Sequence, residues 1–412
     1  MRRIDVVVIG AGPYGLSLGA HLQSRGMDFR IFGKTMASWS ENMPEGMLLK
    51  SYPWASSLSD PDSSFTVKKF CMENALPYDD TLMPLPVDSF ISYGKSFQQR
   101  FVTNVENKQV MKLRPTASGI EVHLENDEFV EASHVVIAIG VTPFANVPAI
   151  ANSVPAEFVS HSSAYGPLDQ LLGKEVAVIG AGSSATNMTA LLHERGIPVT
   201  LVGRRPEIGF AGTPQLRSRF QRMIAPSGGI GDGWTMGLCA TAPWAIHMLP
   251  SSVRLRLAYP RALGPLGGAF MRDRVMGKVP MLLGQNLRRL DIVKDRIELS
   301  FGMAQRPLRV DHVVFATGYK TDLGRLSFLS EDMVAQMRRI ESAPALSRHY
   351  ESSIPGLHFI GPAATNSFGP VSRFVHGTPH PARHLAKYFA AILPQRRIQV
   401  RKAHGIQVAA VR

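Results

Sequence analysis

The sequence predicts an α/β protein with two Rossmann-like dinucleotide-binding domains, the second inserted into the first. The main observation is a repeat: DVVVIGAGPYG at residues 5–15 returns as EVAVIGAGSSA at 175–185, a constant offset of 170 residues. A second echo follows each copy, HVVIAIG at 134–140 and HVVFATG at 312–318. Each stretch reads as a buried strand that ends in glycine, and repeated pairs of this kind indicate two nucleotide-binding units.

Size and charge set broad limits. A chain of 412 residues exceeds what one hydrophobic core supports, so two or three domains are expected. The 45 Lys and Arg against 32 Asp and Glu give a net charge of +13, but the basic residues are scattered and no nucleic-acid-binding motif accompanies them. We therefore expect a solvated surface with a phosphate site and no nucleic-acid partner.

The longest apolar runs end in glycine and fall short of the roughly 20 residues of a membrane span. The N-terminal apolar run passes into a glycine-rich turn where a signal peptide would have a cleavage site. We expect a cytoplasmic protein without integral membrane contact. The two cysteines, Cys71 and Cys239, lack a C-x-x-C spacing, which excludes a local dithiol centre.

The first β-α-β unit occupies residues 5–34. The run VVVI is followed by a glycine turn, a helix with apolar Leu16, Leu18 and Leu22, a stop at Gly26 and a second run, FRIF. In such a turn the glycines permit a tight bend, close approach of a pyrophosphate and helix–strand packing, and the helix N-terminus holds the phosphates. The expected cofactor contacts are Gly10, Gly12, Pro13, Tyr14 and Gly15. Gly33 stands where an acidic residue usually holds the ribose.

The second unit, at 175–205, has the strand VAVI, a helix from about Ser183 to Arg195 and the strand VTLV. Its second strand ends in two arginines instead of an acid. Two guanidinium groups at this position suit a 2′-phosphate, hence NADPH over NADH, although two solvated surface arginines are the alternative. The expected contacts are Gly180, Gly182, Ser183, Ser184, Arg204 and Arg205.

These units divide the chain. We expect an FAD-binding domain at 1–160 and 301–395, and an inserted NADPH-binding domain at 161–300 with a lid or substrate region at about 206–285. The proline-rich stretch 142–158 reads as a linker. The basic tail 396–412 is expected to be mobile.

Two cradles in one chain suggest a relay in which a nicotinamide nucleotide delivers hydride to a tightly held flavin. The sequence shows no paired cysteines, metal-ligand cluster or iron–sulfur spacing, so no metal is expected and molecular oxygen is the simplest electron acceptor.

Five motifs follow one another along the chain: GAGPYG at 10–15, VVIAIGVTPFANVP at 135–148, HSSAY at 161–165, FATGYKTD at 315–322 and PGLHFIGPAATNSFGP at 355–370. In these motifs and their order the chain resembles the class B flavoprotein monooxygenases, which include flavin-containing, N-hydroxylating and Baeyer–Villiger enzymes. The family's fingerprint before the second cradle is only half present: His161 and Tyr165 fit, but Pro155 and Glu157 replace its Phe and Gly.

The resemblance implies that NADPH reduces FAD, that oxygen adds to form a flavin (hydro)peroxide, and that one oxygen atom enters a small organic substrate. Candidate catalytic residues are Lys50, Ser51, Asn366 and His161, each of which also fits a turn, capping or hinge role. Gly318 and Gly361 are further cofactor contacts. Two alternatives stay open: a reductase that passes electrons to a quinone or protein acceptor, and a non-catalytic binding module.

Overall fold

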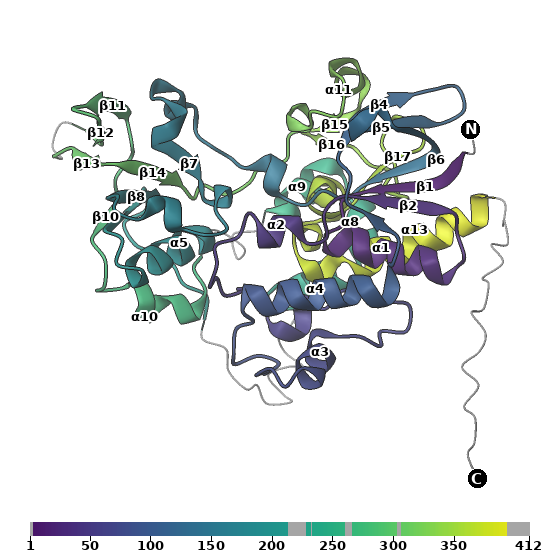
Figure 1. Ribbon diagram of the computed structural model, residues 1–412, viewed down its shortest axis with the longest axis horizontal. Helices are drawn as coiled ribbons and strands as arrows, with labels where there is room; N and C mark the ends of the chain where they lie inside the picture. Colours follow the sequence, from purple (N-terminus) through teal and green to yellow (C-terminus); the bar gives the residue numbers. More distant parts are fainter. Residues whose placement is uncertain (1–2, 213–227, 232, 260–265, 303–305, 394–412) are drawn as a thin grey trace, which may run out of the picture.

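The computed structural model describes residues 3–212, 228–231, 233–259, 266–302 and 306–393. Two α/β units lie at opposite ends of the long axis (Figure 1). Each has its own hydrophobic core, one centred on the N-terminal strand and one on the strand that begins the repeat.

The first sheet has the strand order β3-β2-β1-β6-β5-β4, with β17 also paired to β6. Parallel pairing joins β1 to β2 and β6, while β4, β5 and β6 form an antiparallel meander. β6 is long enough to pair with β5 through its first half and with β17 through its second. The strands are β1 (Ile4–Ile9), β2 (Phe29–Phe32), β3 (Val105–Glu106), β4 (Val110–Pro115), β5 (Ile120–Leu124), β6 (Phe129–Ile137) and β17 (Leu357–Phe359).

Helices α1 (Pro13–Ser24), α4 (Val87–Phe101) and α13 (Pro379–Ile392) pack around this sheet. In α4 the buried side chains recur at helical spacing, with Val87, Phe90, Tyr93 and Phe97 on one face, which explains why this segment is a helix with one solvated side. Four shorter α-helices lie beside them: α2 (Ala37–Ser40), α3 (Val67–Glu73), α11 (Glu331–Gln336) and α12 (Thr365–Phe368). A two-stranded ribbon pairs β15 (Arg339–Ile340) with β16 (Ala343–Pro344).

The second sheet has the order β10-β9-β8-β14-β7, and all its pairs are parallel. The strand β8 is apolar at every position because both faces of the sheet are covered. Val176 and Val178 belong to the hydrophobic cluster on one face, and Ala177 belongs to the cluster on the other face. Helices α5 (Ser183–Glu194) and α10 (Arg272–Val275) lie on one side. The strands are β7 (Val159–His161), β8 (Val176–Ile179), β9 (Val199–Gly203), β10 (Met281–Leu283) and β14 (His312–Phe315). A three-stranded antiparallel sheet of β11 (Arg289–Val293), β12 (Arg296–Ser300) and β13 (Leu308–Val310) covers the other side.

The second sheet extends from Val159 to Phe315, beyond the expected 161–300. The difference lies mainly in β14, which the sequence boundaries assigned to the first domain. β14 pairs with β8 through Ile179 and Phe315, just as β6 pairs with β1 through Ile9 and Ile137. The repeated sequence HVV therefore marks β6 and β14 as equivalent strands in the two repeats.

The two chain crossings between the domains run side by side. Ala145 on the outward crossing and Tyr319 on the return crossing form an antiparallel bridge. Asn146 N donates to Gly318 O at 2.8 Å, and Lys320 N donates to Phe144 O at 2.8 Å. The inserted domain is thus attached by a short double connection.

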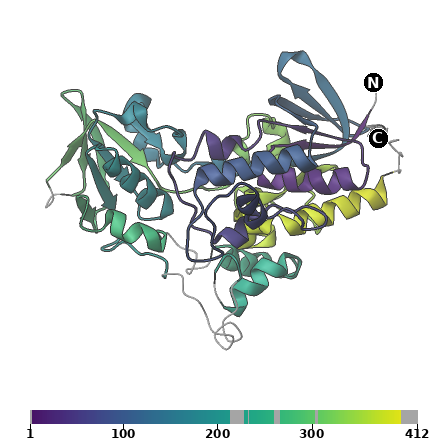
Figure 2. The ribbon, with the colours of Figure 1, turned by 60° about the horizontal axis from the view of Figure 1, so that its bottom comes forward.

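Residues 206–285 pack on both domains where they are described. Ile208, Met271 and Val275 belong to the inserted domain's core. Helices α7 (Trp234–Thr241), α8 (Pro243–His247) and α9 (Ser251–Ala258) instead pack around α12 and Val371 of the first domain, at the lower edge of Figure 2. The expected lid region therefore reaches back over the first domain. Parts of it (213–227, 232 and 260–265) and the tail 396–412 lie outside the described residues.

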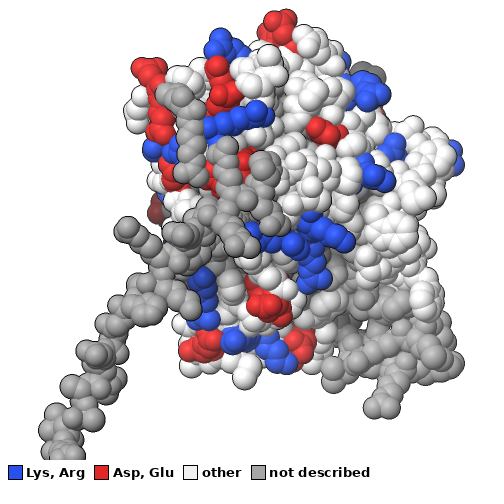
Figure 3. All heavy atoms as spheres, turned by 90° about the vertical axis from the view of Figure 1, so that its right-hand side faces the viewer, with Lys and Arg blue, Asp and Glu red and all other residues white. Residues whose placement is uncertain are grey.

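Among the described residues, no helix is both long and apolar enough to cross a membrane. On the face shown in Figure 3, basic and acidic side chains are interspersed. This distribution matches the expectation that the positive charge is spread over a solvated surface.

Candidate functional site

The first cradle is built from glycines that the fold itself requires. Gly10 has φ +109°, and a Cβ there would lie 2.5 Å from the carbonyl oxygen of Ala138 on the neighbouring strand. A Cβ on Gly15 would lie 1.8 Å from Gly10 O, so no other residue fits between strand and helix at this turn.

Gly12 is different, because nothing in the protein explains its lack of a side chain. Its φ of −89° suits any residue, and a Cβ there would meet no atom within 4 Å. Gly12 is also the N-cap of α1, where no side chain accepts a hydrogen bond from the helix N-terminus. Free amide groups beside open space fit a pyrophosphate, which the dipole of α1 would also favour. The residues present thus match a dinucleotide at this end of β1.

The second cradle repeats this construction. Gly180 has φ +153°, and its Cβ would lie 2.5 Å from Ala316 O, the carbonyl equivalent to Ala138 O. Gly182 is the N-cap of α5 with φ −101° and again no side-chain cap. Ser183 and Ser184 form the first turn of α5 and are partly exposed. The N-terminus of α5 therefore suits phosphate groups for the same reasons as that of α1.

Arg204 and Arg205 follow directly after β9 and are both exposed. Within the ranges that the structure describes, neither guanidinium forms an ion pair with a carboxylate, whereas Arg274 and Arg296 in the same domain do. Both arginines thus remain available to an anion at the edge of the second cradle.

Gly33 explains the missing acid at the end of β2. Its φ is +129°, and a Cβ would lie 3.4 Å from Ala11 N in the first cradle turn. Its N–H donates to Glu106 O at 2.9 Å, which ties the end of β2 to β3. The backbone at residue 33 therefore favours glycine, at the position where related folds often have an acidic residue.

Tyr14 has a role that its position in the glycine motif did not indicate. The side chain is buried, and its hydroxyl contacts three carbonyl oxygens: Phe374 at 2.9 Å, Ser372 at 3.0 Å and Val371 at 3.3 Å. Burial raises the pKa of Tyr14, so the phenol stays protonated and donates. Its ring also lies beneath Gly361, where a Cβ would come within 3.2 Å. Tyr14 thereby fixes the segment after β17 against the first cradle.

We expect Tyr14→Phe to lower the free energy of unfolding by about 0.5–1.5 kcal/mol, the usual net value of one hydrogen bond. The loss stays modest because Phe374 O and Val371 O also accept from backbone N–H groups. Urea titration of both proteins measures the change. Loss of flavin without loss of stability would instead assign the hydroxyl to the cofactor.

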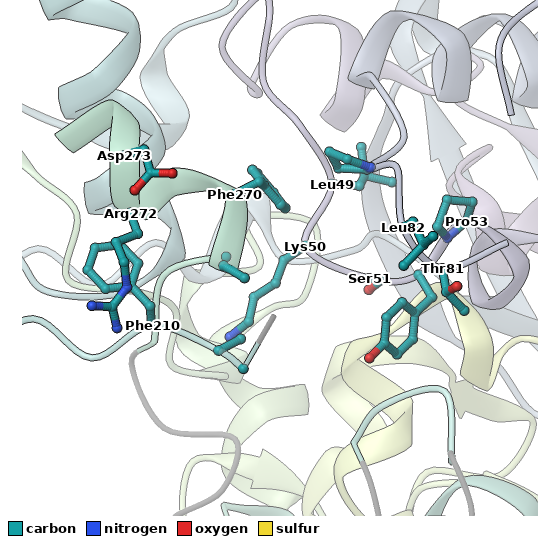
Figure 4. Close-up of a pocket in the computed structure, with 16 residues that line it drawn as sticks. Leu49, Lys50, Ser51, Pro53, Thr81, Leu82, Phe210, Phe270, Arg272 and Asp273 are labelled. Carbon is teal, nitrogen blue, oxygen red and sulfur yellow. The ribbon is translucent and has the colours of Figure 1, made fainter. Parts of the chain in front are cut away.

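A cavity of about 520 Å³ lies between the two domains. Figure 4 shows Phe270, Arg272 and Asp273 on the wall of the inserted domain, opposite Ser51 and Leu82 of the first domain. The Arg272 guanidinium lies 5.1 Å from the centre of the Phe210 ring. The cavity therefore combines aromatic surface with charges of both signs. Its remaining lining residues are Leu49, Lys50, Tyr52, Pro53, Thr81, Pro84, Ala211, Gly212, Gly268 and Ala269.

Lys50 extends from the first domain toward the inserted one, and its Nζ donates to Leu266 O at 2.9 Å (Figure 4). Partial removal of the ammonium group from water and the nearby charge of Arg373 both lower the pKa of Lys50. Lys50 and Ser51 are the two expected catalytic residues that line this cavity.

His161 lies at the double connection between the domains. Its Nδ1 accepts from Ser163 N at 3.1 Å, which leaves Nε2 to donate to Gly318 O at 3.0 Å. Burial lowers the pKa of His161, so the ring is neutral and joins the two crossings. Gly318, with φ +81°, receives this bond and that of Asn146.

Asn366 is buried in α12, outside the cavity lining. Its Nδ2 donates to Ile340 O at 2.9 Å, and its Oδ1 accepts from Tyr259 at 3.0 Å. The side chain therefore joins α12 to the two-stranded ribbon and to the end of α9.

Of the four expected catalytic residues, Lys50 and Ser51 line the interdomain cavity. His161 lies at the connection between the domains, and Asn366 lies where α12 meets the ribbon. Sequence reasoning missed Phe210 and Arg272, which carry no motif.

With this geometry in place, comparison with known proteins identifies the family. Residues 4–230, more than half of the 412-residue chain, match the model for pyridine nucleotide-disulphide oxidoreductases. The chain belongs to this family.

Relatives of this pyridine nucleotide-disulphide oxidoreductase include an uncharacterized CzcO-like oxidoreductase of Geobacillus kaustophilus, 28% identical over 195 residues, which are 46% of this chain and 52% of the relative. Indole-3-pyruvate monooxygenase YUCCA1 of Oryza sativa subsp. japonica is 25% identical over 209 residues, 48% of this chain and 47% of the relative. The chain thus spans about half the length of the curated relatives it matches.

Among solved structures, the ornithine N-hydroxylase of Kutzneria sp. 744 matches with a TM-score of 0.74 at 19% identity, over 95% of this chain and 99% of the other. This likeness confirms the predicted α/β fold.

The cysteines of this pyridine nucleotide-disulphide oxidoreductase are not placed for dithiol chemistry. Cys71 and Cys239 are both free and buried, in α3 and α7 respectively. Each belongs to a different hydrophobic cluster, and burial raises the pKa of both thiols. Reactive thiols instead require exposure and a lowered pKa.

Proposed function

We propose that the protein is an FAD-dependent, NADPH-consuming monooxygenase that transfers one atom of O₂ to a small organic substrate. The balanced reaction consumes NADPH, a proton, O₂ and the substrate, and yields NADP⁺, the oxygenated substrate and water. We place the reaction in the cytoplasm, where proteins usually keep their cysteines reduced, because Cys71 and Cys239 are both free.

The observation that carries the proposal is the pair of equivalent cradles. Each has an uncapped helix N-terminus behind a glycine at a strand end, and only the second is followed by two exposed arginines. This difference supports FAD at the first cradle and NADPH at the second. The Kutzneria ornithine N-hydroxylase, a structure with reduced FAD, NADP⁺ and L-ornithine, has the same fold, and YUCCA1 is an indole-3-pyruvate monooxygenase.

The first cradle would hold the FAD pyrophosphate through the backbone N–H groups of Tyr14 and Gly15, which follow Gly12 and Pro13 at the start of α1, with Gly10 and Gly15 keeping the turn tight. Gly361 begins the segment after β17, which Tyr14 holds beside this turn. Bound FAD would supply hydride acceptance and reaction with O₂. The protein's part is to position the reactants and to keep water out.

The second cradle would hold the NADPH pyrophosphate at Gly182, Ser183 and Ser184, with Arg204 and Arg205 at the 2′-phosphate. Gly318 lies just beyond the end of β14, the strand next to β8, at the same end of the sheet as Gly180.

The interdomain cavity is the proposed place of reaction. Lys50 and Ser51 present polar groups to it, while Phe210 and Phe270 exclude water on the opposite side. Asn366 and His161 would act indirectly, because their hydrogen bonds fix the segment after β17 and the interdomain connection.

A reductase that passes electrons to a quinone or a protein is the second candidate. Reduction of a disulfide through the chain's own thiols is not favoured, because neither cysteine is exposed or paired.

We expect one O₂ to be consumed for each NADPH, with one atom of ¹⁸O₂ recovered in the product. A panel of amines, thioethers, ketones and planar heterocycles should be tested by oxygen electrode, NADPH absorbance and mass spectrometry. The matched control is the same panel with quinone acceptors under argon. Faster NADPH oxidation with a quinone under argon, and no ¹⁸O in any product, would favour the reductase.

A further inference from the structure

Three potential metal ligands meet at the first sheet, in residues that the proposed reaction does not use. They are His134 on β6, His358 on β17 and Glu351 in the loop before β17. One ligand atom from each lies within 4.8 Å of the others. His358 is fully buried, while His134 and Glu351 are half-buried, so the group can be reached from solvent.

Backbone pairing places the three side chains together. β6 and β17 are parallel, with His358 opposite Val136, so His358 and His134 project from the same face of the sheet. Glu351 pairs with His358 through an antiparallel bridge. The Phe389 ring of α13 covers the same face, with its centre 5.0 Å from the His134 ring and 5.2 Å from the His358 ring.

The ligand atoms are also oriented by neighbours. His358 Nδ1 lies 2.9 Å from His349 O, and since a carbonyl only accepts, Nδ1 carries the proton and Nε2 offers a lone pair. His134 Nδ1 lies 3.1 Å from that Nε2. Glu351 accepts from Gly356 N at 2.8 Å. Such outer hydrogen bonds are what fix the ligands in metal sites.

The hydrogen bonds also show which ring nitrogens could bind a metal. His358 Nε2 carries no proton, because Nδ1 donates to His349 O. His134 Nδ1 faces that lone pair at 3.1 Å and carries the proton, which metal binding at this nitrogen would move to Nε2.

We propose that His134, His358 and Glu351 form a binding site for a divalent transition-metal ion of the Zn²⁺ type, with two imidazole nitrogens and one carboxylate oxygen. This ligand set suits zinc, and the site leaves a fourth position for water. Tetrahedral geometry with bonds of about 2.0 Å sets ligand atoms about 3.3 Å apart, close to the 3.1 Å between the two nitrogens. A rotation of the Glu351 side chain brings its oxygen into range, and His134 moves its proton from Nδ1 to Nε2.

The ion would join β17 and its preceding loop to β6. The site is separate from both cradles: the first lies beyond the carboxyl ends of β1 and β6, after Ile9 and Ile137, and the second belongs to the other sheet.

The test uses the full-length, flavin-loaded protein, treated with a chelator, dialysed and titrated with CoCl₂ and ZnCl₂. We expect one Co²⁺ per chain with the visible absorption of a low-coordinate site, competition by Zn²⁺, and a rise in Tm with Zn²⁺. Glu351→Gln keeps the acceptor for Gly356 N and should bind Zn²⁺ more than about 100-fold more weakly, beyond the usual effect of losing only an outer partner.

The matched control is His384→Gln. His384 and His349 form a second histidine pair at 3.0 Å, but the other nitrogen of His349 faces the Arg348 guanidinium instead of a carboxylate. This variant should bind as the wild type does. A wild-type protein that retains no Zn²⁺ at about 100 µM, an unchanged affinity in Glu351→Gln, or a loss in His384→Gln equal to that in Glu351→Gln would each overturn the assignment.

Discussion

Gly12→Asp is expected to give a folded but colourless protein. The backbone at residue 12 has φ −89°, and a Cβ meets no atom within 4 Å, so the substitution causes no clash. Aspartate is also a good N-cap, and its charge suits the N-terminus of α1. A pyrophosphate at the same place would face a carboxylate, and two like charges about 4 Å apart repel by about 4 kcal/mol near a protein surface, close to a thousandfold in affinity.

The measurement is the ratio of flavin absorbance to protein absorbance, beside circular dichroism and Tm. Gly182→Asp is the matched control, since residue 182 has the same capping position on α5 and a similar φ of −101°. This variant should stay yellow and be reduced by dithionite, but not by NADPH. Full flavin content in Gly12→Asp would show that the first cradle does not hold FAD.

The Arg204→Ala, Arg205→Ala double variant should lose its preference for NADPH over NADH. A charge-assisted hydrogen bond to a 2′-phosphate contributes about 1.5–3 kcal/mol, so loss of one contact weakens NADPH by roughly 10- to 150-fold. NADH has no 2′-phosphate, so its affinity should stay nearly constant. Both arginines are exposed, and high salt should therefore reproduce part of the loss.

Anaerobic flavin reduction, followed against the concentration of each nucleotide, measures this preference. Arg288→Ala removes an exposed arginine from the same domain and serves as the control for net charge. Flavin content should be unchanged in all variants. Equal losses for NADPH and NADH would assign the two arginines to stability, and a wild type that prefers NADH would contradict the choice of NADPH.

Local patterns in the sequence were sufficient to predict both β-α-β units. The helix expected from about Ser183 to Arg195 is α5, Ser183–Glu194, because its limits depend on a neighbouring glycine turn and on Gly196. The glycine positions also follow locally, since Gly10 and Gly180 must pass close to a carbonyl oxygen of the adjacent strand. The local patterns did not indicate that β14 belongs to the second sheet, because it pairs there with β8, a strand far earlier in the chain.

The candidate site was predictable only in part. Lys50 and Ser51 were chosen from a resemblance and do line the interdomain cavity. Phe210 and Arg272 reach the same cavity through tertiary packing, which no local motif records. Tyr14 shows the opposite case: it lies inside a cofactor motif, yet its hydroxyl binds carbonyl groups more than 350 positions later in the chain.

The bridge between Ala145 and Tyr319 has a consequence for how such a duplicated protein can arise. The backbone leaves and re-enters the first sheet's domain at one point, so for chain closure the inserted residues count as a single long loop, although α7, α8 and α9 also pack on the first domain. Loop-closure entropy grows only with the logarithm of length, and a loop of roughly 170 residues costs about 2.5 kcal/mol more than one of ten. A gene segment that folds by itself can therefore be spliced into this position at little thermodynamic cost to its host.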